Sequence, residues 1–188
     1  MPVTNATAFT DIDRNAYYYE ALLWAVEENI IEGISATEFA PHAPCTRGQA
    51  VTMLWRASGC PEPLWKDHSF TDVSEDAYYY QPMLWAVRKR ATNGVSATEF
   101  APQASCSRGE LVTLMWRSLG DAVRRPDLPF QDVKKGTYYY EAVMWAVSDE
   151  ITRGVSSTHF APADPCTRAQ MVTFLYRCHI NVGFAVEI

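Results

Sequence analysis

The stretch FTDVSEDAYYYQPMLWAVRKRATNGVSATEFAPQASCSRGELVTLMWR, residues 70–117, decides the fold because the chain carries its pattern three times. Residues 9–56 and 130–177 align with it without a gap, and 19 of the 48 positions are identical in all three copies. Such repetition is typical of architectures in which each unit needs its neighbours to bury an apolar face. We expect repeats at 1–59, 60–120 and 121–188, the last with a C-terminal tail.

Each copy predicts two helices. Residues 17–28 carry apolar side chains at helical spacing. In the second copy, Pro82 requires a helix that begins near Tyr80 or that holds Pro82 in its first turn. The second helix should begin at a Ser or Thr that is followed three residues later by Glu or Gln, the capping-box pattern. These pairs are Thr46 with Gln49, Ser107 with Glu110, and Thr167 with Gln170.

The second helix is apolar almost all round, so we expect it to lie in the centre of the molecule. A cysteine precedes each capping box: Cys45, Cys106 and Cys166. That position suits a hydrophobic staple, and a free cysteine behaves as a small apolar group. A three-thiolate metal site on a pseudo-threefold axis is the alternative. The five cysteines include no C-x-x-C pair, which argues against a disulfide framework and a conventional zinc site. We expect no cofactor.

Charge and hydropathy exclude several partners. The formal net charge of −6 gives no pervasive basic field, so a nucleic-acid partner is not expected. No run of about 18 apolar residues occurs, so membrane insertion is not expected either. The first residues, Met1 to Asn5, do not resemble a signal peptide; a mature secreted fragment and a cytosolic protein would both begin in this way.

The ionisable residues that recur, apart from tyrosine and cysteine, are one aspartate and two arginines per copy. They are Asp11, Asp72 and Asp132; Arg47, Arg108 and Arg168; and Arg56, Arg117 and Arg177. No histidine recurs, and this set offers no pair of titratable groups suited to acid–base catalysis. We therefore expect a binding protein with no catalytic residues, not an enzyme.

The arginine at the first position of each second helix calls for compensation, because a cation there opposes the helix dipole at a cost of about 0.3–1 kcal/mol. Open backbone donors of the helix start, together with the guanidinium, would form a receptor for a carboxylate or phosphate. The alternative is an internal salt bridge to a repeated aspartate such as Asp72. Both can hold, because a buried aspartate can orient an arginine that still reaches a ligand.

Aromatic residues recur in two settings. Trp24, Trp85 and Trp145 lie at helical spacing, which favours core packing over sugar-stacking platforms. Three consecutive tyrosines in each copy cannot all face one core, so at least one hydroxyl per copy should be exposed and able to line a groove.

In their order, these motifs resemble the S-layer homology domain family. That family's units run Phe-x-Asp-Val, an aromatic-led helix, a glycine-containing loop, Phe-x-Pro, and Thr-Arg-Ala-Glu at the start of a second helix. In the second copy the pattern reads Phe70-Thr71-Asp72-Val73, residues 78–87, Gly94, Phe100-Ala101-Pro102 and Ser107-Arg108-Gly109-Glu110. All three windows match, about three quarters of the chain.

The resemblance implies an all-α fold in which three tandem helix-loop-helix repeats surround a central helical bundle in a pseudo-threefold arrangement. It also implies an extracellular protein of the bacterial cell surface that binds acidic, pyruvylated secondary cell wall polysaccharide in grooves between repeats. The family's arginine, aspartate and loop glycine map onto Arg47, Arg108, Arg168, Asp11, Asp72, Asp132, Gly33, Gly94 and Gly154. We predict these nine as ligand-binding residues.

Departures from the family pattern predict unequal grooves. Gln49 and Gln170 replace the motif's glutamate, and residues 88–90 are basic where the other copies are acidic. Many members carry glycine where Asn29, Arg90 and Glu150 stand, and of these only asparagine readily adopts a left-handed backbone, so we expect the loop geometry to differ. The alternative function is a structural or protein-interaction module that keeps the fold and has lost glycan binding.

Overall fold

The fold is all-α, as the sequence predicts. The computed structural model describes residues 8–63, 67–120 and 127–183, and within these ranges it contains six helices and no strand. The helices are α1 (Tyr19–Glu27), α2 (Arg47–Ala57), α3 (Tyr80–Arg88), α4 (Arg108–Leu119), α5 (Tyr140–Ser148) and α6 (Arg168–Val182). None of the helices in these ranges combines the length and apolarity that a bilayer crossing needs.

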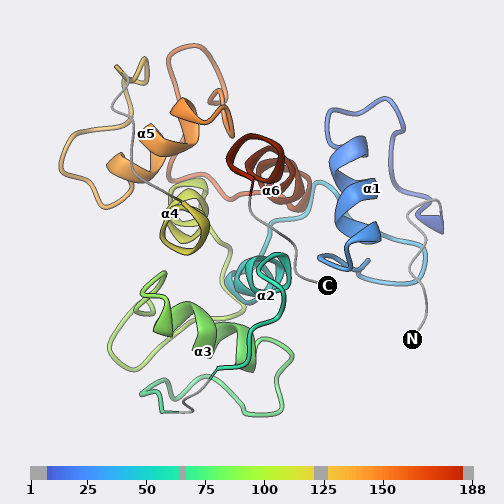
Figure 1. The fold of residues 1–188 in the computed structure, drawn as a ribbon, viewed down its shortest axis with the longest axis vertical. Helices are drawn as coiled ribbons and strands as arrows, with labels where there is room; N and C mark the ends of the chain where they lie inside the picture. Colours follow the sequence, from blue (N-terminus) through green and yellow to red (C-terminus); the bar gives the residue numbers. More distant parts are fainter. Residues whose placement is uncertain (1–7, 64–66, 121–126, 184–188) are drawn as a thin grey trace.

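The second helix of each repeat lies at the centre of the molecule. Figure 1 shows α2, α4 and α6 grouped around the middle, with α1, α3 and α5 outside them in three lobes. Helix α2 contacts both α4 and α6. Most residues of these three helices are buried, which confirms the prediction drawn from their apolar character.

Each lobe combines helices from two different repeats. The outer helix α3 packs on α2, α5 packs on α4, and α1 packs on α6 at the other end of the chain (Figure 1). The sequence repeat is therefore not the packing unit, because the second helix of one copy covers the first helix of the next. The pairing of α1 with α6 closes the ring without a covalent link.

A cycle of backbone hydrogen bonds joins the three repeats just before their second helices. The amide of Cys45 donates to the Cys166 carbonyl (2.7 Å), that of Cys106 to Cys45 (2.8 Å), and that of Cys166 to Cys106 (2.9 Å). The three thiols are fully buried, and burial raises the pKa of Cys45 and Cys166 to about 12, so they stay protonated. No group of side chains in the described ranges is placed to hold a metal ion, which favours the apolar interpretation of these cysteines.

Local signals place the helix starts as predicted. In each second helix the Ser or Thr side chain accepts a hydrogen bond from the third helical amide. The Gln or Glu side chain accepts one from the backbone amide of that Ser or Thr, so all three capping boxes are confirmed. Pro82 is the third residue of α3, whose first turn requires no amide donor from it.

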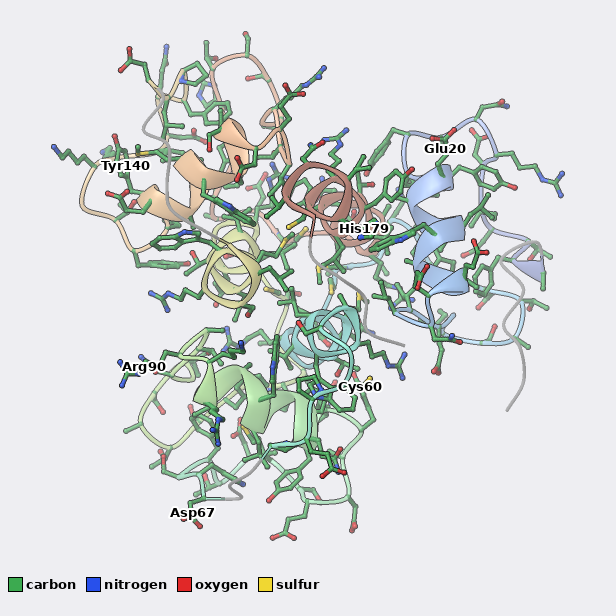
Figure 2. The ribbon with its side chains drawn as sticks, in the orientation of Figure 1. Glu20, Cys60, Asp67, Arg90, Tyr140 and His179 are labelled. Atoms are coloured by element: carbon green, nitrogen blue, oxygen red, sulfur yellow. The ribbon has the colours of Figure 1, made fainter. Side chains whose placement is uncertain are left out.

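The repeated tryptophans pack in the core, as their spacing predicts. Trp85 and Trp145 are buried, and Trp24 is partly buried where α1 meets α6. There its ring stacks on that of His179 with centroids 5.0 Å apart, and Figure 2 shows His179 between these two helices. Of the C-terminal tail, residues 178–182 prolong α6, with Cys178 buried, and residues 184–188 lie outside the described part.

Candidate functional site: clefts between the repeats

The repeated aspartate holds the loop that follows the first helix. Both carboxylate oxygens of Asp72 accept amide hydrogens, from Phe100 at 2.9 Å and Ala101 at 2.7 Å. Burial would raise the pKa of Asp72, but these two donors, its own backbone amide and the charge of Arg47 together lower the pKa. Asp11 and Asp132 make the same pairs of bonds in their own repeats.

This bonding overturns one interpretation of the arginines. In the described ranges no aspartate forms an ion pair with Arg47, Arg108 or Arg168, so the proposed Arg–Asp salt bridge is wrong. The reason is geometric, because both carboxylate oxygens of the aspartate accept loop amides of its own repeat. The aspartate thereby positions the loop, and the arginine of the preceding repeat contacts a carbonyl of that loop.

The predicted loop glycines lie where the chain passes tightly over a phenylalanine ring. A Cβ on Gly94 would lie 2.5 Å from Cε1 of Phe70, and the residue has a left-handed φ of +82°. Gly33 and Gly154 pass equally close to Phe9 and Phe130. The glycine therefore lets the loop sit against the core, and the neighbouring loop residues face the space between repeats.

The position where many family members carry glycine has the same backbone conformation in all three copies. Asn29, Arg90 and Glu150 all have left-handed φ angles, of 56°, 58° and 55°. In each case the amide donates to a carbonyl three residues earlier, at the end of the first helix. The surrounding fold imposes this turn on arginine and glutamate as well, at a cost in backbone strain.

The arginine of each second helix reaches across into the next repeat. The Nε of Arg47 donates to the Phe100 carbonyl at 2.9 Å, and its guanidinium lies 5.0 Å from the centroid of the Phe100 ring. Arg108 contacts Phe160 and Arg168 contacts Phe39 in the same way. All three arginines are buried, with exposed fractions between 3% and 5%.

The backbone donors of the helix start are not open, contrary to our expectation. The amides of Arg47 and Gly48 donate to the carbonyls of Ala104 and Pro102, each at 2.9 Å, and the other two repeats do the same around the ring. The third helical amide donates to the side-chain oxygen of the capping Ser or Thr. Any anion receptor at this point therefore consists of side chains, chiefly the guanidinium.

Two equivalent clefts lie beside these arginines, each of about 390 Å³. Each draws on all three repeats: a loop and a second-helix face from one, an arginine from the repeat before it, and a tyrosine from the repeat after it. The first cleft is lined by residues 30–34, Gln49, Thr52, Met53, Arg56, Tyr78 and Arg168. The second is lined by residues 91–95, Glu110, Thr113, Leu114, Arg117, Tyr138 and Arg47.

Each tyrosine triplet contains one exposed residue, as expected because three consecutive tyrosines cannot all face one core. Tyr17, Tyr78 and Tyr138, the first of each triplet, are exposed by 62%, 59% and 56%, and the latter two line the clefts.

The predicted ligand-binding residues divide among three places. Arg168 and Gly33 line the first cleft, and Arg47 and Gly94 line the second. The aspartates are not among the lining residues and act on the loops instead. Arg108 and Gly154 belong to the third equivalent position, where the guanidinium also lies 5.5 Å from the Phe174 ring.

A carboxylate at the capping position distinguishes the second cleft from the first. Glu110 accepts a hydrogen bond from Nη1 of Arg47 at 2.9 Å. The sequence identified Glu110 as the capping partner of Ser107, and the glutamines at the equivalent positions predicted unequal grooves, but nothing in the sequence predicted the contact of Glu110 with Arg47. Burial lowers the pKa of Arg108 and Arg168, which have no carboxylate partner in the described ranges.

Comparison with known proteins supports the pattern that the motifs suggested. The family model described as the S-layer homology domain matches residues 8–51, 69–112 and 129–172, more than two thirds of the chain.

Three relatives are similar along nearly all of the chain. The surface-layer 125 kDa protein of Lysinibacillus sphaericus is 28% identical over 100% of this chain. An endoglucanase of Bacillus sp. (strain KSM-635) is 28% identical over 89%, and an S-layer protein of Bacillus thuringiensis subsp. finitimus is 22% identical over 95%. The chain spans only 16%, 18% and 22% of the length of these relatives.

Proposed function

Since the chain belongs to the S-layer homology domain family, we propose that it is a non-covalent cell-wall anchor whose inter-repeat clefts bind an acidic, pyruvylated secondary cell wall polysaccharide. The family and the surface-layer relatives support the anchoring role and a location at the bacterial cell surface. The acidic specificity is our own step, and it rests on the clefts.

The observation that carries this proposal is the buried guanidinium beside an open cleft. Arg168 lines the first cleft, is only 4% exposed, and contacts two carbonyl oxygens and an aromatic ring; among the described residues no carboxylate pairs with it. A desolvated cation gains from an anionic partner, and a guanidinium binds a carboxylate with paired, charge-assisted hydrogen bonds. The carboxylate of a pyruvate ketal on a terminal sugar matches this requirement.

The remaining lining suits the sugar that carries the acid. Tyr78 presents an exposed aromatic ring, and Ile34, at 57% exposed, presents an aliphatic surface at the loop. Apolar and aromatic surface with a few polar groups is the usual lining of small-molecule sites. We propose that the arginines contact the acid, that residues of the glycine loops contact the sugar, and that the aspartates hold those loops in place. In this proposal the chain binds its ligand and does not transform it.

The test compares binding to two forms of one purified cell wall: native wall and wall from which mild acid has hydrolysed the pyruvate ketals. We expect the chain to sediment with native wall and to remain largely in solution with treated wall. Free methyl hexoside that carries a pyruvate ketal should compete, whereas its methyl ester should not. Equal retention on both walls would contradict acid recognition and would favour the alternative, a module that keeps the fold for protein contacts.

Changing the wall is preferable to replacing all three arginines with alanine. Each arginine bonds a carbonyl of the next repeat and packs on its phenylalanine, so the triple variant would lose contacts that join the repeats. A loss of binding in that variant could follow from unfolding alone.

A further inference from the structure

Arg108, at the third equivalent position, is held differently from the arginines of the two clefts. In the first cleft, Nη2 of Arg168 donates to the Glu32 carbonyl of the loop at 2.8 Å. In the second, Nη2 of Arg47 reaches the Thr92 hydroxyl of the equivalent loop at 3.5 Å. The Nη2 of Arg108 is buried and has no hydrogen-bond partner among the described residues, so it lacks this contact with the loop.

A second aromatic ring lies against Arg108 instead. Its guanidinium carbon is 4.8 Å from the centroid of the Phe160 ring, which is the contact that all three arginines share, and also 5.5 Å from that of Phe174. Phe174 belongs to α6 and is 4% exposed. Its equivalents are Met53 and Leu114, which line the first and second clefts. At the third position, therefore, a bulkier ring occupies a lining site and contacts the cation.

Few of the lining positions distinguish the third groove from the two clefts. By the repeat alignment, the third groove consists of residues 151–155, Gln170, Thr173, Phe174, Arg177, Tyr17 and Arg108. Of these eleven residues, nine are identical to the equivalent residue of the first or the second cleft, and the exceptions are Arg153 and Phe174. The Arg153 side chain is 84% exposed, and its positive charge would favour an acid. Phe174 is thus the difference that can close the groove.

We propose that Phe174 closes the third groove, so that the chain has two acid-binding clefts and not three. This inference deepens the proposed function and rests on it. A guanidinium that faces two aromatic rings gains cation–π attraction, which is strongest where water is excluded. A ligand carboxylate would have to move a buried, packed ring before it could reach Nη2 of Arg108. The first and second clefts need no such movement, because each is already open beside its arginine.

A donor without a partner can also mark a site that awaits a ligand. The burial of the Arg108 Nη2 argues against that interpretation in the unaltered chain, because a donor that solvent does not reach is not reached by a sugar acid either. A smaller side chain at position 174 would uncover this donor. The sequestered atom would then become the binding group of an opened groove.

The experiment exchanges residues that the chain already carries at equivalent positions. Phe174→Met and Phe174→Leu give the third groove the side chain of the first or the second cleft, and Met53→Phe gives the first cleft the side chain of the third. Arg153→Asn is the matched control, because it changes the other distinguishing position to the residue of the second repeat.

The probe is the methyl hexoside that carries a pyruvate ketal, and its methyl ester is the neutral control. Titrations followed by amide chemical shifts report the three grooves separately, through residues 30–34, 91–95 and 151–155. Thermal unfolding of each variant shows whether the fold is retained, and the two substitutions of Phe174 provide independent tests of the same groove.

In the unaltered chain we expect the acid to shift the amides of residues 30–34 and 91–95 and to leave residues 151–155 unshifted. Both Phe174 variants should bind the acid in the third groove with an affinity within about tenfold of that of the first cleft. Met53→Phe should weaken the first cleft at least about tenfold. Arg153→Asn should leave the third groove without binding, and the ester should shift none of the three sets.

The outcomes that overturn this inference are distinguishable from a failure of the proposed function. If residues 151–155 of the unaltered chain respond like residues 30–34, the third groove is open despite Phe174. If they stay unshifted in both Phe174 variants, or respond in Arg153→Asn alone, another group closes the groove. In these cases acid recognition by the two clefts stands. If the acid shifts no resonance in any groove at saturating concentration, acid recognition itself fails, and the inference fails with it.

Discussion

Arg90 and Glu150 hold a backbone conformation that glycine adopts without strain. Their φ angles of 58° and 55° are left-handed, which costs a residue with a Cβ about 1–2 kcal/mol. We predict that Arg90→Gly and Glu150→Gly each raise the free energy of unfolding by about 0.5–1 kcal/mol, after the larger unfolded-state entropy of glycine is deducted. Urea denaturation measures the change.

Asn29→Gly is the matched control for these two variants. Asparagine tolerates the left-handed region, so the gain there should be clearly smaller. Among the described residues, the only side-chain partner that Glu150 would lose is Arg153, in an exposed contact at 3.8 Å that contributes little to stability. A lower free energy of unfolding in Glu150→Gly would contradict the strain argument.

Single residues were predictable from sequence where a local pattern fixes their role. The arginine at the first helical position and its capping neighbours were correct because the Ser/Thr-x-x-Gln/Glu spacing determines them. The partner of that arginine was not predictable. Arg47 donates a hydrogen bond to Glu110, which is 63 residues away, and no local sequence pattern predicts a contact between repeats.

At the scale of the helix, the capping boxes predict a measurable contribution. The Thr46 side chain accepts the Gln49 amide at 3.2 Å at the start of α2, whose first turn has no acidic residue. We predict that Thr46→Ala lowers the free energy of unfolding by about 1 kcal/mol. The control is Thr37→Ala, at an exposed threonine that forms its hydrogen bonds through its backbone amide and carbonyl. Equal denaturation midpoints for the two variants would show that the cap contributes nothing.

The same caps explain why some helix boundaries were predicted better than others. All three second helices begin where their boxes place them. The first helices have no side-chain cap, and α1 begins at Tyr19, two residues after the start expected from hydrophobic spacing alone. Spacing identifies the helix and its buried face, whereas a side chain that bonds the first-turn amides identifies the residue at which it begins.

At the scale of the whole molecule, sequence repetition and family resemblance suggested three units around a bundle, but not which helix covers which. Helix α1 needs an apolar partner, and its own repeat contains one in α2. The structure pairs it with α6 instead. Hydrophobic spacing shows that a helix face is buried, but it does not identify the helix that covers it. Only the structure shows that each first helix packs on the second helix of a different repeat.

This closure makes the first repeat depend on the last residues of the bundle. Helix α6 buries Met171, Val172, Phe174, Leu175 and Cys178, each of whose apolar side chains contributes about 1.5–3 kcal/mol on burial. Losing them would remove much of a net stability that is typically 5–15 kcal/mol. A chain that ends at residue 167 should therefore unfold without a cooperative transition, and the amides of α1 should lose hydrogen-exchange protection although every residue of the first repeat is present.

A synthetic peptide of residues 168–188 added in trans should restore both signals, because no covalent link joins α6 to the helix it covers. Retained protection of α1 in the shortened chain would mean that the first repeat folds on its own, and the ring would then be an assembly of independent units.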